Sequence, residues 1–167
     1  YAQEMVAKAT DPVVAAGPAV RWHAIGRLQR NKVRLLVPHV DLWQAVDRPS
    51  LGREIAKRAP GSRVLVQVNV SGEPQKGGCD PEVTPALVDE LREAGLVVEG
   101  LMTVARAGGG ATASGQFAEL RAQVDRLGLT TCSMGMSGDY REAVAEGATM
   151  LRLGTVLVGE RPPADAR

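Results

Sequence analysis

Short apolar segments of strand length alternate along this sequence with segments that have the period of a helix. The clearest strand is RVLVQVNV, residues 63–70, because it is rich in valine and has the length of a buried strand. The clearest helix lies at 115–128, where apolar residues recur on one helical face at Phe117, Leu120, Val124 and Leu127. Strands that alternate with helices in this way predict an α/β fold with a parallel sheet and right-handed crossovers.

The same pattern predicts six strands with helices between them. The strands are expected at 20–26, 42–47, 63–70, 96–104, 130–136 and 149–159. The helices are expected at 1–10, 31–39, 50–58, 84–94, 115–128 and from residue 139 onward, with Ser50 and Glu54 opening the third of them. A flexible glycine-rich loop is expected at 108–114. A doubly wound sheet and a barrel both fit this rhythm.

The position of the glycine-rich turns bears on that choice. No GxGxxG follows the first strand, as it does in a dinucleotide fold. The glycine turns come last instead, in SMGMSGD at 133–139 and LRLGT at 151–155. An eight-stranded barrel commonly places its phosphate site in the loops after its last two strands. These turns stand where such a barrel would have them.

The residue types in the two turns suit a phosphate monoester. Hydroxyl groups come from Ser133 and Ser137, and Asp139 is expected to cap the helix that follows, so that its N-terminus forms an anion site. Gly154 lets the backbone approach a phosphate closely, and Thr155 adds a donor. The alternative is that these glycines only make tight turns and the serines only cap helices, and the residue pattern alone leaves it open.

Composition argues against several other classes of protein. The net charge is +1 and only 3% of the 167 residues are aromatic, so the chain has neither the basic charge nor the aromatic residues for base stacking that are typical of nucleic-acid-binding proteins. Cys79 and Cys132 stand alone, in no metal-ligand spacing, and indicate reduced thiols in a cytoplasmic protein. No apolar run has the length of a membrane span. We therefore expect neither nucleic acid nor a membrane as partner, and no metal.

Several long motifs occur together in this chain. They are WHAIGRLQRNK, VLVQVNVSGEPQKGG, GLMTV, SMGMSGDYREAVAEGATMLRLGT and GERP. In this order and at these spacings they resemble the pyridoxal phosphate homeostasis proteins. The resemblance covers nearly all of residues 1–167 and implies a single TIM-type (β/α)8 barrel domain of the alanine racemase N-terminal kind. It also implies bound pyridoxal 5'-phosphate (PLP), a role in vitamin B6 homeostasis and no turnover of its own.

The resemblance also implies which residues contact the cofactor. Phosphate contacts correspond to Ser133 or Ser137 and to Gly154 with Thr155, and Arg152 corresponds to the arginine that faces the pyridine nitrogen in related racemases. A guanidinium there disfavours protonation of that nitrogen, which makes the ring a weaker electron sink. His23, Met102 and Asn69 are expected at strand ends near the site. As alternatives, each of these three is a core residue that simply packs.

One departure from the family pattern concerns the Schiff-base lysine. The resemblance implies that this lysine lies on the first barrel strand, in a segment that the sequence lacks. We therefore expect the first two strands to be missing from this chain, and we assign no catalytic residue. The remaining lysines are Lys8 and Lys57 on outer helices and Lys32 and Lys76 on the ligand face.

A sheet without those two strands has exposed edges. We expect them at 20–26 and 149–159, and they invite pairing with another chain. The expected state is a monomer or a weak homodimer, with PLP-dependent apoenzymes as further partners.

Two other functions stay open. One is a racemase-like PLP enzyme, for which Tyr1 and Tyr140 are the available tyrosines. The other is a barrel that binds sugar phosphates.

Overall fold

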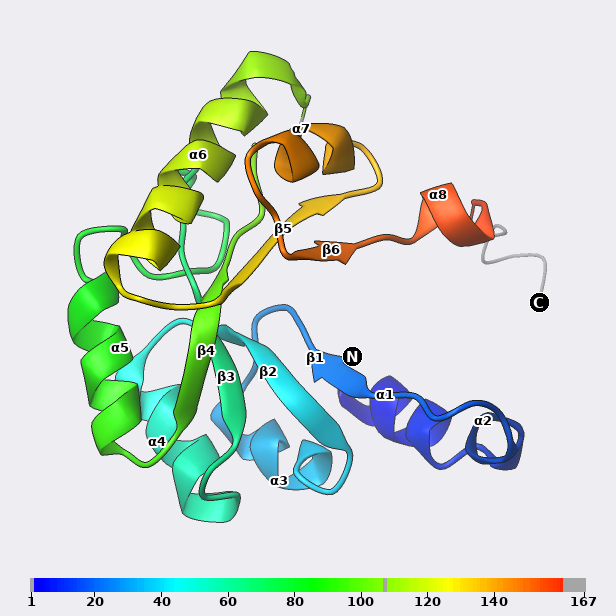
Figure 1. Cartoon of the computed structure of the whole chain (residues 1–167). Helices are drawn as coiled ribbons and strands as arrows, with labels where there is room; N and C mark the ends of the chain where they lie inside the picture. Colours follow the sequence, from blue (N-terminus) through cyan, green and yellow to red (C-terminus); the bar gives the residue numbers. More distant parts are fainter. Residues whose placement is uncertain (1, 107, 161–167) are drawn as a thin grey trace.

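The protein folds into one curled parallel sheet whose outer face is covered by helices (Figure 1). The computed structural model describes residues 2–106 and 108–160. The six strands lie in sequence order, each parallel to its neighbours. They are β1 (Trp22–Ala24), β2 (Val40–Val46), β3 (Arg63–Gln67), β4 (Val97–Met102), β5 (Thr131–Met136) and β6 (Met150–Arg152). The predicted parallel sheet of six strands is confirmed.

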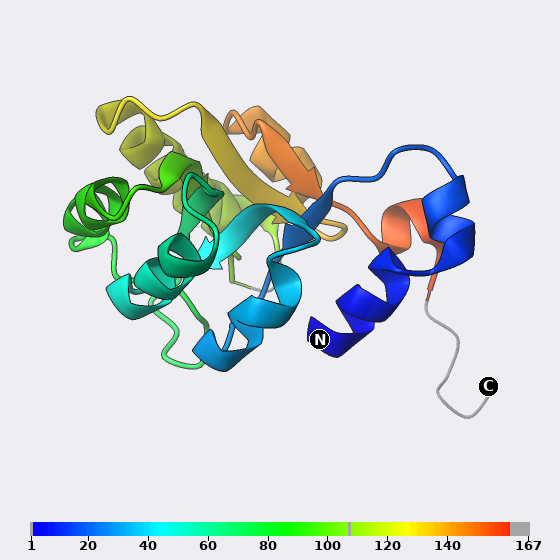
Figure 2. The same ribbon diagram turned by 90° about the horizontal axis from the view of Figure 1, so that it is seen from below.

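The helices follow the strands in the expected alternation. They are α1 (Ala2–Ala9), α2 (Pro12–Ala16), η1 (Arg30–Lys32), α3 (Val33–Leu36), α4 (Pro49–Arg58), α5 (Thr84–Glu93), α6 (Gly110–Arg126), α7 (Tyr140–Ala145) and α8 (Thr155–Val158). Seen from below, α1 and α2 lie together at one side of the molecule (Figure 2). Within the described residues β1 and β6 each pair on one side only, so the two expected edges are confirmed.

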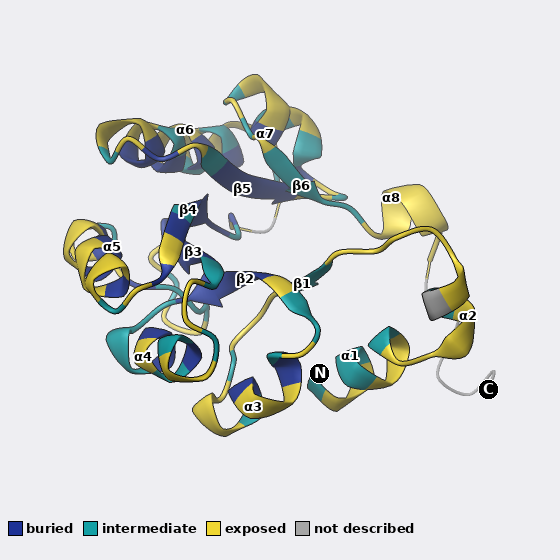
Figure 3. Ribbon diagram, turned by 60° about the horizontal axis from the view of Figure 1, so that its bottom comes forward, coloured by how far each residue is buried: buried dark blue, intermediate teal, exposed yellow. Residues whose placement is uncertain are grey.

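The main hydrophobic core lies between the outer face of the sheet and the helices. The buried residues of the helices, dark blue in Figure 3, lie on the sides of the ribbons that are turned toward the strands. Phe117, Leu120 and Val124 of α6 are all completely buried there, as the helical period predicts. A second, smaller apolar cluster lies on the inner face of the sheet and consists of Leu42, Ala45, Leu65 and Met102. The inner face is therefore only partly apolar.

Two segments depart from the expectation in a way that bears on the site. The predicted strand 149–159 is wrong: only Met150–Arg152 pair with β5, and Thr155–Val158 form a helical turn. The chain leaves the sheet because the N–H groups of Leu157 and Val158 bond back to the carbonyl of Gly154. The predicted loop 108–114 is also wrong from Gly110 onward, where α6 begins. Ala113 is completely buried, and packing of this first turn favours the helix over a loop.

Smaller differences concern where elements end. The strand expected at 63–70 ends at Gln67, after which Val68 makes one isolated bridge with Cys79. The helix expected at 31–39 begins as a 3₁₀ turn and ends at Leu36. α4 begins at Pro49 and not at Ser50, because proline fits the first turn of a helix, where no N–H is needed.

Candidate ligand site

A chain of hydrogen bonds crosses the inner face of the sheet and joins four strands. Arg152 Nη1 donates to Ser133 Oγ at 2.8 Å, and Ser133 Oγ donates to Gln44 Oε1 at 2.7 Å. Gln44 Nε2 lies 2.8 Å from His23 Nδ1. We call Arg152, Ser133, Gln44 and His23 the polar ladder. It brings together residues from β6, β5, β2 and β1 that are far apart in the sequence.

The two central members of the polar ladder are buried, and the two outer members, Arg152 and His23, are partly buried. Ser133 has no exposed surface and Gln44 is 2% exposed. A buried polar group without a partner costs about 1–3 kcal/mol, so each hydrogen bond of the ladder matters for the next. The strand alternation that aims these side chains inward also aims the neighbouring residues Trp43 and Cys132 toward the helices.

Arg152 is a partly buried cation held only by neutral groups. Its second amino group, Nη2, donates to the backbone oxygen of Thr103 at 2.6 Å. Burial lowers the pKa of the Arg152 guanidinium, and the nearby Asp139 opposes that shift. No ion pair to Arg152 occurs among residues 2–106 and 108–160. Two of its five N–H donors are used in these bonds, which leaves three for a ligand.

His23 lies at the other end of the ladder, on the edge strand β1. Burial lowers the pKa of its imidazole, and the charge of Arg21 adds to this, while Asp41 acts in the opposite direction. At neutral pH these effects favour the uncharged ring. His23 also contacts Gln44 of the polar ladder, which agrees with the expectation that it lies near the other site residues.

Beyond the ladder, the turns after β5 and β6 meet. Ser137 Oγ accepts the N–H of Gly154 at 3.1 Å and that of Val156 at 3.4 Å. A Cβ atom added at Gly154 would have no neighbour within 4 Å, so open space lies over this backbone. Gly135 differs: its φ is +90° and a Cβ there would lie 2.5 Å from that of Ala143. We call these two turns the turn pair, with Ser137 in the first and Gly154, Thr155 and Val156 in the second.

The turn pair differs from the expected phosphate cradle in two respects. Ser133 is not part of it, because its hydroxyl is occupied by Arg152 and Gln44 on the inner face. Asp139 stands at the N-cap position of α7 but does not cap it with its side chain. Its carboxylate accepts the N–H of Met136 at 2.6 Å instead, which fixes the turn after β5. Thr155 is exposed at the first position of α8.

Two of the expected site residues have structural tasks. Both polar ends of the Asn69 side chain serve its own loop: Nδ2 donates to the oxygen of Glu73 at 3.0 Å and Oδ1 accepts from Ser71 at 2.9 Å. Met102 is 2% exposed and packs in the inner apolar cluster. For both residues the packing alternative agrees better with these contacts than a direct part in binding.

Two functional groups of the site were missed in the sequence. Gln44 lies in the strand segment LWQAVD, where its amide stands between the apolar residues 42–43 and 45–46. A buried polar residue at the centre of a strand was a signal that could have marked it. The backbone oxygen of Thr103 carries no sequence signal, because every residue has one. Only the approach of Arg152 makes it part of the site.

The lysines and the described tyrosine are occupied elsewhere or lie apart from the ladder. Lys76 Nζ donates to the oxygen of Ala105 at 2.7 Å and pairs with Glu73 at 2.6 Å. Lys8 pairs with Glu4 on α1. The hydroxyl of Tyr140 accepts a hydrogen bond from Arg141, and the Arg141 guanidinium lies 5.8 Å from the ring centre. Tyr1 lies outside the described residues.

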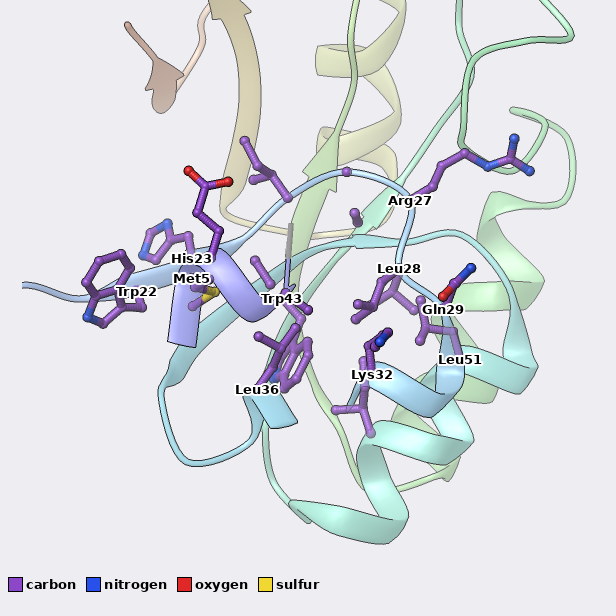
Figure 4. A pocket seen from close by; sticks show the side chains of 18 of the residues that line it. Met5, Trp22, His23, Arg27, Leu28, Gln29, Lys32, Leu36, Trp43 and Leu51 are labelled. Carbon is purple, nitrogen blue, oxygen red and sulfur yellow. The ribbon is translucent and has the colours of Figure 1, made fainter. Parts of the chain in front are cut away.

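A cavity in the described part of the chain lies apart from the turn pair. It has a volume of about 790 Å³ and is lined by residues of α1, β1, η1, α3 and α4 (Figure 4). Trp43, Leu36 and Leu51 form its floor between sheet and helices, and Lys32 lies at its side. Of the polar ladder only His23 lines it. The hydrogen-bond geometry, and not this cavity, marks the candidate site.

Comparison with known proteins defines the class of the fold. Residues 3–162 match the family described as alanine racemase, N-terminal domain, so the chain belongs to that family. An alanine racemase from Clostridium difficile, 16% identical, has the same fold with a TM-score of 0.66 over 90% of this chain and 42% of that one. The predicted fold of the alanine racemase N-terminal kind is confirmed, here as a curled, open part of a barrel.

Within that class the relatives carry one name. A pyridoxal phosphate homeostasis protein of Pseudomonas aeruginosa is 38% identical over 96% of this chain and 72% of its own length. The one from Deinococcus radiodurans is 43% identical over 86% of this chain and 70% of its own. PipY of Synechococcus elongatus, solved with PLP bound, is 34% identical, with a TM-score of 0.82 over 95% of this chain and 79% of that one. The chain belongs to the pyridoxal phosphate homeostasis proteins, as its motifs predict.

One further finding concerns membranes. No helix in the described residues is both long enough and apolar enough to span a bilayer.

Proposed function

We propose that this chain binds pyridoxal 5'-phosphate between the polar ladder and the turn pair, and that it holds the cofactor as a carrier in vitamin B6 homeostasis. The observation that carries the proposal is the pair of hydrogen bonds from the N–H groups of Gly154 and Val156 to Ser137, near Arg152, a cation that has no ion pair within the described residues. The names of the relatives and the bound PLP in the PipY structure support it.

The turn pair fits the phosphate group. Two backbone N–H groups and a hydroxyl already converge there, and the Cβ position of Gly154 opens to free space. These donors are held in place by each other before a ligand arrives. A dianionic phosphate would exchange the weak Ser137 contacts for charge-assisted hydrogen bonds, which are about twice as strong as neutral ones.

Arg152 fits the pyridine nitrogen of the cofactor. A guanidinium donates hydrogen bonds and cannot accept a proton, so it would meet that nitrogen in its unprotonated form. When bound, PLP supplies an aromatic ring that withdraws electrons from a carbon attached to it, and an unprotonated nitrogen weakens this effect. Such a pairing suits storage and transfer better than catalysis. We therefore propose that the chain is not an enzyme.

The cellular side of the proposal follows from the same role. A protein that holds PLP needs acceptors, and PLP-dependent apoenzymes are the chemical class that requires it. We place this exchange in the cytoplasm, because both cysteines are unpaired, as expected in a reducing compartment. We propose a monomer or a weak homodimer, with the edges at β1 and β6 as the surfaces through which copies would pair.

The first experiment is a PLP titration of this chain followed by absorbance. Borohydride reduction and mass mapping then show whether Lys8, Lys32, Lys57 or Lys76 carries the cofactor. We expect binding that inorganic phosphate weakens, with none of these lysines modified. Stoichiometric modification of Lys32 or Lys76 would contradict this assignment. Stronger competition by a sugar phosphate than by phosphate would favour a sugar-phosphate-binding barrel, and interconversion of D- and L-alanine would show an enzyme.

Arg152→Ala tests the site itself. Loss of its charged hydrogen bonds should weaken PLP retention by about 1–3 kcal/mol. Arg141→Ala is the matched control, because Arg141 is an exposed arginine on α7 that bonds to Tyr140 and not to the polar ladder. Equal PLP affinity in the two variants would contradict the assignment of Arg152.

A further inference from the structure

The side-chain amide of Gln44 is fixed in one orientation by three neighbours. Its Oε1 accepts the hydroxyl of Ser133 at 2.7 Å. Its Nε2 lies 2.8 Å from His23 Nδ1 and 3.2 Å from the sulfur of Met150. Gln44 is 2% exposed, so no solvent competes for these contacts.

Arg152 sets the direction in which hydrogen bonds are donated along the polar ladder. A guanidinium only donates, so the oxygen of Ser133 accepts from it, and the hydroxyl hydrogen of Ser133 is left to donate to Gln44 Oε1. The amide nitrogen then faces His23. In the flipped orientation the amide oxygen would lie against the Met150 sulfur, which is an acceptor, and the Ser133 hydrogen would lose its partner.

This direction decides the state of His23. An amide NH2 group has hydrogens to donate and no acceptor lone pair, so Nδ1 must accept. The ring is then neutral and carries its hydrogen on Nε2. No hydrogen bond to Nε2 is formed within the described residues, so this N–H is available to a ligand oxygen.

We propose that Gln44 is the positioning residue of the site: it holds Ser133 against Arg152 and fixes His23 as a neutral Nε2–H donor for an anionic or carbonyl oxygen of the ligand. The proposal rests on the proposed function only for the identity of that ligand. The fixed state of His23 is a property of the protein without any ligand, and it is testable there.

The charged groups around His23 act on its pKa in both directions, and the largest of their effects, that of Arg21, favours the neutral ring. Arg21 precedes it on the same segment, and Asp41 of β2 accepts the N–H of Trp22 at 2.7 Å. Arg63 of β3 and Glu99 of β4 act on His23 from farther away with opposite signs, and they pair with each other at 2.9 Å. No carboxylate bonds to either His23 nitrogen among the described residues, so none draws a proton onto the ring.

The experiment is nitrogen-15 NMR of the histidine side chains in the ligand-free protein. The chain has only two histidines, His23 and His39, so His39→Gln assigns both sets of signals. A hydrogen-bearing and a bare ring nitrogen differ widely in chemical shift. We expect a single His23 form with its hydrogen on Nε2, and a pH titration in which this form persists well below neutrality. A hydrogen on Nδ1, or an equal mixture of both forms, would overturn the proposal, whatever any variant does.

Gln44→Glu is the decisive variant. It places a carboxylate oxygen against Nδ1, so the hydrogen should move to Nδ1 and the pKa of His23 should rise by about one to three pH units. Gln67→Glu is the matched control. Gln67 is also buried, lies on the neighbouring strand β3 and bonds to Gly77 outside the ladder. The control should leave the His23 hydrogen on Nε2. An unchanged His23 in folded Gln44→Glu would overturn the role of Gln44.

Failure of this inference and failure of the proposed function are distinguishable. If the wild-type protein has the expected His23 form but no PLP binds, the proposed function is wrong and Gln44 still positions the ladder for another ligand. If PLP binds but His23 has both forms, PLP binding stands and the role of Gln44 is wrong.

Discussion

The two faces of the sheet are both largely buried, yet they are built on different principles. The outer face packs valine, leucine and phenylalanine side chains against the helices, and it holds most of the core. Among the described residues, the buried apolar cluster of the inner face has four members, and a cation, an amide, a hydroxyl and an imidazole lie beside it. Apolar packing stabilises the fold without specifying a ligand, whereas the polar groups cost stability unless they bond to each other or to something bound. The outer face should therefore determine stability and the inner face binding.

The largest effect should come from the centre of the outer face. Phe117→Ala removes a completely buried ring and leaves a cavity, which should lower the free energy of unfolding by about 3–5 kcal/mol. Denaturant unfolding measures this change. Leu157→Ala on the exposed α8 is the control and should change stability by less than about 0.5 kcal/mol. If the Phe117 variant stays folded and its free energy of PLP binding falls by more than its free energy of unfolding, the assignment of stability to the outer face and binding to the inner face is wrong.

The next effect depends on pH and again belongs to the outer face. Burial raises the pKa of the Cys132 thiol to about 11 from an ordinary value of 9.0. As the pH rises from about 9 to about 11, the unfolded chain loses this proton while the native chain keeps it. The stability contribution, present in full below pH 9, is therefore lost over this range, by about 3 kcal/mol.

Denaturant unfolding between pH 8 and pH 11 measures that loss. Cys132→Ala lacks the thiol, so its stability should fall less steeply over the same range. Other titrating groups, including Cys79, whose pKa burial also raises, act on both proteins equally and cancel in the difference. Parallel pH curves for the two proteins would show that Cys132 is not sealed from water.

A smaller effect on stability should accompany a change on the inner face. Ser133→Ala leaves Arg152 Nη1 and Gln44 Oε1 without their shared partner, which should lower the free energy of unfolding by about 1–3 kcal/mol. PLP retention should weaken as well, because Arg152 loses its fixed position. Ser62→Ala, which removes only a loop hydrogen bond to Ala59, serves as the control in both measurements. Normal PLP retention in Ser133→Ala would show that the ladder does not position Arg152.

The smallest change in stability is expected at the turn pair. Ser137 is half-buried, and water can replace its contacts to Gly154 and Val156, so Ser137→Ala should alter the free energy of unfolding by less than about 1 kcal/mol. PLP affinity, measured by titration, should still fall by about 0.5–1.5 kcal/mol, the usual contribution of a neutral hydrogen bond. A loss of stability larger than that of Ser133→Ala would reverse the ranking of ladder and turn.

Much of the fold was predictable because its signals are local. The valine-rich segment at β3 and the apolar period of α6 place these elements almost correctly, since burial on one face imposes a period on the sequence. The prediction of one strand over 149–159 was wrong, because a run of apolar residues is typical of a strand but does not require one. After Arg152 the chain turns away from the sheet, and the apolar residues Leu157 and Val158 are exposed on α8.

The site was predictable in part. Ser137 and Gly154 were expected together, because glycine and hydroxyl residues after neighbouring strands meet at one edge of a parallel sheet. Ser133 was expected with them, but it lies four residues before Ser137, inside the strand, and faces Arg152. A strand directs successive side chains to opposite faces, and one residue of register decides which face a hydroxyl reaches.

The sequence by itself determined the parallel α/β alternation, the outer core and the class of protein, and it named the arginine and glycine residues of the candidate site. These follow from local periodicity and from long motifs, which are readable without coordinates. Only the tertiary structure decided that Gln44 joins Ser133 to His23, because the three residues stand on β2, β5 and β1 and nothing in their neighbours links them. The curl of the sheet brings them within hydrogen-bond distance. Because Gln44 and Ser133 are buried, their polar atoms bond to protein groups instead of water.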